Sequence, residues 1–185
     1  MTLLTPANQL TLTRVLLTPA IVILTVYGYF GWALVVFAAA GATDLLDGLI
    51  ARTWSRRTTL GAWLDPVADK LLLVSTFVVL TIPGLGLVNR LPLWLTILII
   101  SRDVVIVLTV AIINLAVGRR EFRPSIFGKM ATATYICTCV IIMYFNFLER
   151  PSWLVQVSIY ASLAITVVSA FHYLVQTARI INESA

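Results

Sequence analysis

The feature that most constrains this chain is a series of six long apolar stretches separated by short polar connections. A helix needs about 20 apolar residues to cross a bilayer, and in lipid only a helix satisfies its backbone groups within one segment. Charged residues make up 11% of the chain, against about a quarter in soluble proteins. We therefore predict an all-α integral membrane protein, a single domain over residues 1–185. Its six transmembrane helices are expected near residues 10–30, 32–52, 60–82, 91–117, 128–148 and 153–178.

The N-terminal segment differs from these stretches. Residues 2–13 are mildly amphipathic and contain Pro6, so we expect an interfacial lead-in to the first span. The opening sequence MTLLTPANQL lacks the basic region and the small-residue cleavage site of a signal peptide. We therefore expect no such peptide here.

Positive charge gathers on one side of the predicted helices. The net charge of +5 would suit nucleic acid, but the basic residues fall mainly in short loops, where orientation and lipid headgroups explain them better. We expect no nucleic-acid partner. Arg90 and Arg150 lie on one side, and the other side carries Arg14, Arg52, Arg56, Arg57, Lys70, Arg119, Arg120, Arg123, Lys129 and Arg179. The positive-inside rule places this second side, with both termini, in the cytoplasm, and the protein in the cell inner membrane or its equivalent.

Four of the eight acidic residues lie close together in the chain, at Asp44, Asp47, Asp65 and Asp69. Their spacings of three and four put each pair on one face of a helix, and a short loop brings both pairs to the same depth. An acidic residue at the centre of a span costs about 2.5–3.5 kcal/mol on insertion scales, and close carboxylates repel one another. Protonation, basic partners or bound cations would offset this cost. Carboxylates without histidine or thiolate neighbours favour Mg²⁺ or Mn²⁺ over zinc.

The residues beside these aspartates suggest what the cations serve. Gly48 and Ala51 share the helical face of the first pair and leave room for a ligand near the backbone. Arg52 follows one turn after Gly48, and its fork of donors suits a phosphate. Together they predict a nucleotide or pyrophosphate site, where two metal ions about 3.5–4 Å apart would stabilise a displacement at phosphorus.

The four aspartates allow other interpretations. They could be structural partners of Arg52, Arg56 and Arg57, although four acids in this arrangement make that explanation weak. An ion or proton transporter also uses intramembrane carboxylates, but here they cluster at one end of the membrane, without an inverted repeat or broken helices. A non-catalytic lipid-binding scaffold would need no fourth aspartate.

The complete pattern resembles a known signature. It reads Asp44-x-x-Asp47-Gly48-x-x-Ala51-Arg52, eight residues, Gly61-x-x-x-Asp65-x-x-x-Asp69, and it is similar at every position to the motif of the CDP-alcohol phosphotransferases. The opening Asn8-x-x-Thr11-x-x-Arg14, with the segments ISRDV and RPSIFGK, resembles the branch of that family that holds phosphatidylglycerophosphate synthases and cardiolipin synthases.

This resemblance implies Mg²⁺- or Mn²⁺-dependent transfer of a phosphatidyl group from CDP-diacylglycerol to an alcohol, with release of CMP. Asp44, Asp47 and Asp65 would bind metal, and Asp69 would be the general base with a share in the second ion. Gly48, Ala51 and Arg52 would line the pocket for cytidine and diphosphate, with further contacts from Thr58 and Asn8. Membrane lipids would surround the site, and the resemblance also implies a homodimer.

The sequence defines the acceptor alcohol less closely than the CDP-diacylglycerol donor. Glycerol 3-phosphate and phosphatidylglycerol both suit this branch. Arg102 inside the fourth span would bind the acceptor's phosphate, or else form a buried ion pair with another helix. Lys129 at the mouth of the fifth span is a second candidate for binding that phosphate. Adjacent helical residues do not face each other, so we expect Arg102 and Asp103 not to be mutual partners. His172 is expected to be a packing or interfacial residue. Cys137 and Cys139, two apart in one helix, are not expected to form a disulfide.

Overall fold

The computed structural model describes residues 6–53, 59–116 and 125–182, and it describes their side chains except those of residues 6–10, 44–53, 59–66, 113–114, 116 and 179–182. These residues form helices and connecting turns, without a strand in the described ranges. The helices are α1 (Pro6–Val26), α2 (Phe30–Thr53), α3 (Thr59–Thr81), α4 (Leu93–Ala116), α5 (Ile126–Phe147) and α6 (Trp153–Asn182). The described residues thus form six helices, as predicted, and a membrane crossing by all six stays a prediction.

The first helix corrects one detail of the prediction. Residues 6–13 belong to α1, which begins at Pro6 and runs unbroken to Val26, and the interfacial position of this segment stays a prediction. Proline fits the first position of a helix, where its missing N–H would have no intrahelical partner and its fixed φ is already helical. Pro19 lies inside the same helix. Pro6 is therefore the first residue of this helix.

The distribution of polar and apolar side chains is that of a membrane protein. Three helical segments are long and apolar enough to cross a bilayer, namely Leu93–Ile112, Ile126–Phe147 and Trp153–Ala178, and two shorter apolar segments cover Thr11–Val26 and Phe30–Thr43. Large apolar residues face outwards, among them Leu16, Ile112 and Phe171. Many threonines and serines are buried instead. A water-soluble fold would bury the first set, so the chain is an integral membrane protein.

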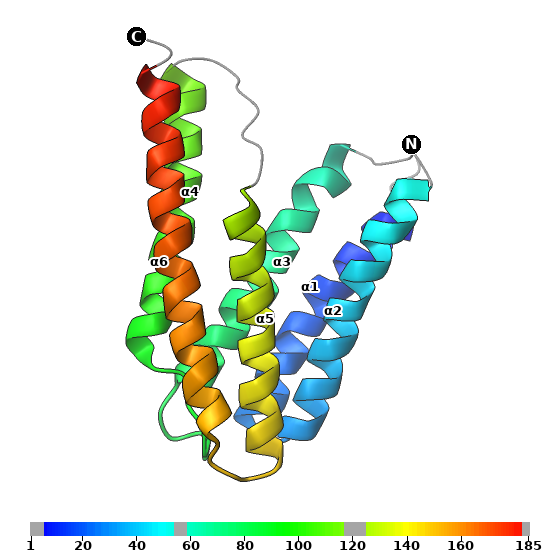
Figure 1. Cartoon of the computed structure of the whole chain (residues 1–185). Coiled ribbons are helices and arrows are strands. Elements are labelled where there is room, and N and C mark those ends of the chain that lie inside the picture. Colours follow the sequence, from blue (N-terminus) through cyan, green and yellow to red (C-terminus); the bar gives the residue numbers. More distant parts are fainter. Residues whose placement is uncertain (1–5, 54–58, 117–124, 183–185) are drawn as a thin grey trace. The chain divides into compact units, whose positions relative to one another are not determined.

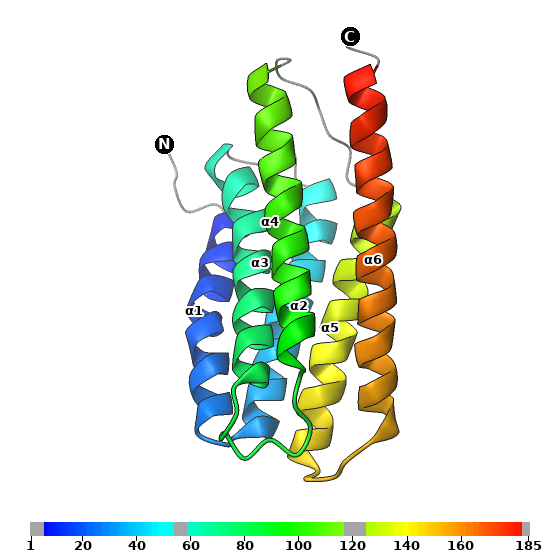
Figure 2. The ribbon, with the colours of Figure 1, turned by 90° about the vertical axis from the view of Figure 1, so that its left-hand side faces the viewer.

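The described helices group into two compact units. The first comprises residues 1–90 with 139–152, and the second comprises residues 91–138 with 153–185. In the first unit α1 packs against both α2 and α3, as Figure 1 and Figure 2 show. Its buried apolar residues include Ile21, Phe37, Phe77, Leu80 and Ile142.

Two contacts attach the C-terminal part of α5 to the rest of the first unit. Asn89 and Asn146 exchange hydrogen bonds: the Asn89 backbone N–H donates to Asn146 Oδ1 at 2.9 Å, and Asn146 Nδ2 donates to the Asn89 carbonyl at 2.9 Å. Asn89 Nδ2 also donates to the Arg150 carbonyl at 2.8 Å. The ring of Phe147 lies against Gly31, where a Cβ would come within 2.8 Å of it. A glycine at this position in α2 permits the close approach.

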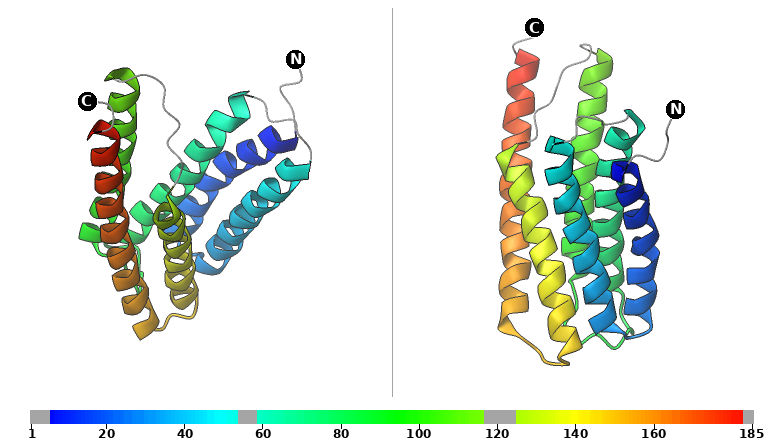
Figure 3. Two further views of the ribbon diagram at one scale, coloured as in Figure 1. Left: turned by 45° about the horizontal axis from the view of Figure 1, so that its top comes forward. Right: turned by 90° about the vertical axis from the view of Figure 1, so that its right-hand side faces the viewer.

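The second unit contains α4, α6 and the N-terminal part of α5. The helices α4 and α6 lie side by side (Figure 3). Buried hydroxyl groups join α5 to α6: Tyr135 Oη lies 2.6 Å from Thr166 Oγ1, and Thr138 Oγ1 lies 2.8 Å from Ser162 Oγ. Such interhelical hydrogen bonds contribute to association in lipid, where hydrophobic burial between helices contributes little.

Candidate functional site

The four aspartates lie on two consecutive helices of the first unit. Asp44 and Asp47 fall in the C-terminal half of α2, and Asp65 and Asp69 fall in the first half of α3. Both segments are continuous helix, as the sequence predicted, so spacings of three and four place each pair of positions on one helical face. The backbone therefore agrees with one part of the metal-site prediction, the placement of each pair on one helical face.

Most of the predicted donor-site side chains lie outside the described set. This applies to Asp44, Asp47, Gly48, Ala51, Arg52, Asp65 and Asn8, and Thr58 lies in a segment that is itself outside the described residues. Among the described side chains, no group of three or more His, Cys, Asp or Glu gathers. Asp69 is the one motif aspartate that belongs to that set. The metal and nucleotide roles of these residues stay predictions.

Asp69 has a basic partner that the sequence interpretation did not identify. Arg14 on α1 donates from Nη1 to Asp69 Oδ1, across the packed pair α1 and α3. Arg14 is buried, with 1% of its side chain exposed, whereas 39% of the Asp69 side chain is accessible. The sequence had suggested Arg52, Arg56 and Arg57 as possible partners for the aspartates. The sequence does indicate that Arg14 pairs with another helix. A charged residue inside a span needs a partner, and α1 contains no acidic residue that could be one.

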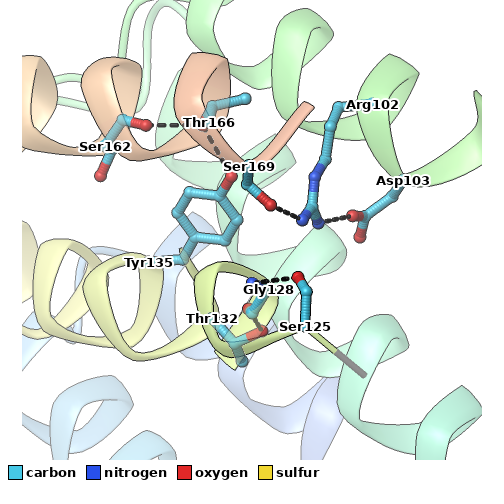
Figure 4. Close-up of polar contacts among 9 residues, drawn as sticks. All are labelled: Arg102, Asp103, Ser125, Gly128, Thr132, Tyr135, Ser162, Thr166 and Ser169. Carbon is cyan, nitrogen blue, oxygen red and sulfur yellow. Dashed lines mark hydrogen bonds and ion pairs between the residues drawn. The ribbon is translucent and has the colours of Figure 1, made fainter. Parts of the chain in front are cut away.

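Arg102 lies at the centre of a second polar cluster, on facing helices of the second unit (Figure 4). Its Nη1 donates to Asp103 Oδ1 at 2.7 Å, and its Nη2 donates to Ser169 Oγ on α6. The expectation that Arg102 and Asp103 are not mutual partners is therefore wrong. Their Cβ atoms point in different directions, but the arginine side chain is long enough to turn back to its neighbour. Exposures of 10% and 21% for the two side chains give little water to compete with this ion pair.

Arg102 retains one donor with no partner. Its Nε is buried and makes no hydrogen bond among the described residues. Tyr173 Oη and Thr177 Oγ1 are likewise buried without a partner among the described residues. They follow Ser169 at helical intervals of four on α6, so the three hydroxyls lie on one face of that helix. Tyr173 and Thr177 were missed by the sequence interpretation, which considered only charged residues for the acceptor site.

The other residues singled out from the sequence are also placed in the second unit. Ser125 begins α5 as its N-cap, because its Oγ accepts the Gly128 N–H at 3.0 Å and its carbonyl accepts the Lys129 N–H at 3.2 Å. Lys129 itself is exposed in the first turn of α5. His172 packs against Phe127, with ring centroids 4.8 Å apart, as expected of a packing residue. Cys137 and Cys139 are both free, which confirms that they form no disulfide.

Comparison with known proteins identifies the family of this chain. Residues 4–170 match the family model of CDP-alcohol phosphatidyltransferases. A probable phosphatidylglycerophosphate synthase of Mycobacterium tuberculosis is 33% identical over 182 residues, a match that covers 94% of this chain and 81% of that protein. Human cardiolipin synthase (CMP-forming) is 47% identical over 104 residues, which cover 56% of this chain and 33% of that protein.

A third relative has a name that specifies its reaction. The CDP-diacylglycerol–glycerol-3-phosphate 3-phosphatidyltransferase of Pseudomonas fluorescens is 44% identical over 106 residues, which cover 54% of this chain and 51% of that protein. The family model covers most of the chain, including the aspartate motif. With its helical membrane fold and its complete motif, this chain belongs to the CDP-alcohol phosphatidyltransferase family.

Proposed function

We propose that this enzyme transfers a phosphatidyl group from CDP-diacylglycerol to the hydroxyl of a glycerol phosphate ester and releases CMP. The observation that carries the proposal is the complete aspartate motif on two consecutive helices, within a chain that the family model covers over residues 4–170. The mycobacterial relative, matched over 81% of its length, is called a probable phosphatidylglycerophosphate synthase, and the human relative, with the higher local identity, is called a cardiolipin synthase. Glycerol 3-phosphate and phosphatidylglycerol share the glycerol phosphate group that the proposal names.

The donor set suits two Mg²⁺ or Mn²⁺ ions. Asp44, Asp47, Asp65 and Asp69 offer only carboxylate oxygens, which these hard cations prefer, and their backbone positions repeat at helical spacing. We propose that these four aspartates hold the ions. When bound, the ions would neutralise the negative charge that develops on the phosphates during transfer.

The protein residues have separate tasks in this proposal. Asp69 accepts the proton of the acceptor hydroxyl as a general base, which makes the oxygen nucleophilic towards the lipid-side phosphorus. The bond to CMP then breaks, and Arg52 stabilises the charge left on the departing phosphate. Gly48 and Ala51 leave room for the nucleotide beside the helix. Thr58 and Asn8 add contacts to it.

The acceptor's phosphate is assigned to Arg102 and Lys129. Arg102 supports this proposal because its buried Nε has no acceptor among the described residues. A phosphate oxygen would satisfy that donor, and a charge-assisted hydrogen bond to phosphate is a strong one. The ion pair with Asp103 holds the guanidinium in place and leaves Nε to the ligand. Lys129 is exposed at the start of α5 and would add a positive charge that attracts the acceptor's phosphate.

An acceptor panel tests the proposal. Purified protein with CDP-diacylglycerol receives glycerol 3-phosphate, phosphatidylglycerol, inositol phosphate or serine, in Mg²⁺, in Mn²⁺ or in chelator, and CMP release is measured. We expect release with glycerol 3-phosphate or with phosphatidylglycerol, and its loss in chelator. Comparison of CMP release with glycerol 3-phosphate and with phosphatidylglycerol shows which of the two is the acceptor. Absence of release with every acceptor in both metals would contradict the proposal.

The Asp69→Asn variant makes the same test at the residue level. Loss of a general base is expected to lower the rate of CMP release by about 10²–10⁴-fold, while the protein still folds. Glu149→Gln is the matched control, because Glu149 is exposed and lies outside the motif. A non-catalytic lipid-binding protein would release no CMP in either form, and this outcome would distinguish it from the enzyme.

A further inference from the structure

Arg14 is a buried cation in a helix that is otherwise apolar and weakly polar. Its side chain is 1% exposed, although arginine is almost never fully buried unless it is paired. Burial of an ion pair carries a desolvation penalty of several kcal/mol for each ion, and apolar residues of similar volume often give a more stable protein. Stability alone is therefore a weak reason for an arginine at this position.

The geometry of the pair is asymmetric. The arginine is enclosed between helices, whereas its partner Asp69 keeps 39% of its side chain accessible. The contact joins α1 to α3 over a separation of 55 residues. A planar guanidinium is a preorganised donor that fixes the orientation of a carboxylate. The buried Arg14 side chain thus holds the accessible Asp69 carboxylate through one atom, Oδ1.

We propose that Arg14 is a positioning residue, which holds the Asp69 carboxylate in the orientation that the transfer reaction requires. The inference rests on the proposed function, because that function makes Asp69 the general base. Catalytic groups are sensitive to such support: a displacement of about 1 Å can lower a rate by about 10²-fold. Arg14 acts through Asp69 and not on the nucleotide, so its effect belongs to the chemical step.

A purely structural role for Arg14 makes a different prediction. If the pair only joined α1 to α3, its loss would lower the unfolding midpoint and leave the turnover of folded protein intact. If Arg14 orients Asp69, kcat falls in protein that is folded and still binds CDP. The KM for CDP-diacylglycerol should then change little, since an interaction needed only for the chemical step affects kcat.

Two substitutions and one control make the test. Arg14→Gln removes the charge, and Arg14→Lys keeps a charge and a long stem but loses the planar fork. Thr25→Val is the matched control, because Thr25 is buried in the same helix and donates only to the Ile21 carbonyl, at 2.8 Å. For each protein we would measure the unfolding midpoint, equilibrium binding of CDP in Mg²⁺, and kcat and KM for CMP release.

We expect kcat to fall by about 10²-fold in Arg14→Gln and by about tenfold in Arg14→Lys, with CDP affinity unchanged in both. Thr25→Val should keep the wild-type kcat. If Arg14→Gln does not fold, Arg14→Lys decides. A wild-type kcat in folded Arg14→Lys, with the wild type active, would overturn the positioning role and leave the proposed function standing. A wild type that releases no CMP would overturn the proposed function, and the positioning role with it.

Discussion

Single residues at two helix ends show how the chain uses the left-handed backbone conformation. After α1, the Gly28 N–H donates to the Thr25 carbonyl at 3.1 Å and the Tyr29 N–H donates to the Leu24 carbonyl at 2.8 Å. After α5, the same pair of bonds runs from Glu149 to Asn146 and from Arg150 to Phe145, both at 3.1 Å. Both ends are Schellman motifs. The left-handed position has φ of 80° at Gly28 and 52° at Glu149, so only the first has the residue that tolerates it without strain.

Replacement of Glu149 by glycine should therefore stabilise the protein. A left-handed conformation costs a residue with a Cβ about 1–2 kcal/mol, and the greater flexibility of glycine in the unfolded chain returns part of that gain. We expect Glu149→Gly to raise the free energy of unfolding by about 0.5–1 kcal/mol, measured as a higher unfolding midpoint in detergent. Glu149→Ala is the control, since it removes the charge and keeps the strain. Equal stabilisation by both variants would attribute the effect to charge.

At the scale of the element, α5 and α6 are joined by buried hydroxyl groups. Thr138 is fully buried, and its Oγ1 contacts Ser162 Oγ at 2.8 Å and the Ser158 carbonyl at 3.2 Å. Thr132 lies on the same helix but is exposed, and it donates to the Gly128 carbonyl of its own helix at 3.2 Å. The hydroxyl of Thr138 therefore bonds to α6, whereas the hydroxyl of Thr132 bonds within α5.

This pair of threonines allows a matched measurement of interhelical hydrogen bonding. Valine has nearly the shape of threonine without the hydroxyl, so Thr138→Val removes the contacts with α6 and leaves Ser162 with one partner fewer. We expect a loss of about 1 kcal/mol in the free energy of unfolding. Thr132→Val should have little effect, because its hydroxyl bonds only within α5. Equal losses from the two variants would contradict a role for these hydroxyls between helices.

At the scale of the whole molecule, the distribution of charge predicts the orientation in the membrane. Arg150 lies at one end of the predicted spans, and most of the basic residues lie at the other end, which the positive-inside rule predicts to be cytoplasmic. In a background with Cys137→Ala and Cys139→Ala, a cysteine in place of the exposed Arg150 should react with an impermeant thiol reagent added outside intact cells. A cysteine in place of Ala185 should react only after the membrane is opened. The reverse pattern would overturn the assigned orientation.

The sequence predicts the fold further than it predicts the site. Hydropathy identifies all six helices, and the span predicted at 128–148 is helix α5, Ile126–Phe147, because apolar length is a local property of the chain. The pairing of Arg14 with Asp69 could not be derived in the same way. It depends on which helices pack together, and the partners are 55 residues apart. The Arg102–Asp103 contact was missed for another reason: helical spacing describes Cβ directions and not the reach of a long side chain.

The paired asparagines have a consequence for the order in which the protein is made. Asn89 and Asn146 are 57 residues apart, and the first unit is completed only by residues 139–152. The helices that carry the aspartate motif therefore leave the ribosome well before the segment that completes their unit. Until α5 has been inserted, the Asn89 backbone N–H lacks the acceptor that it has in the finished protein. The motif is synthesised early, but its supporting unit closes late in translation.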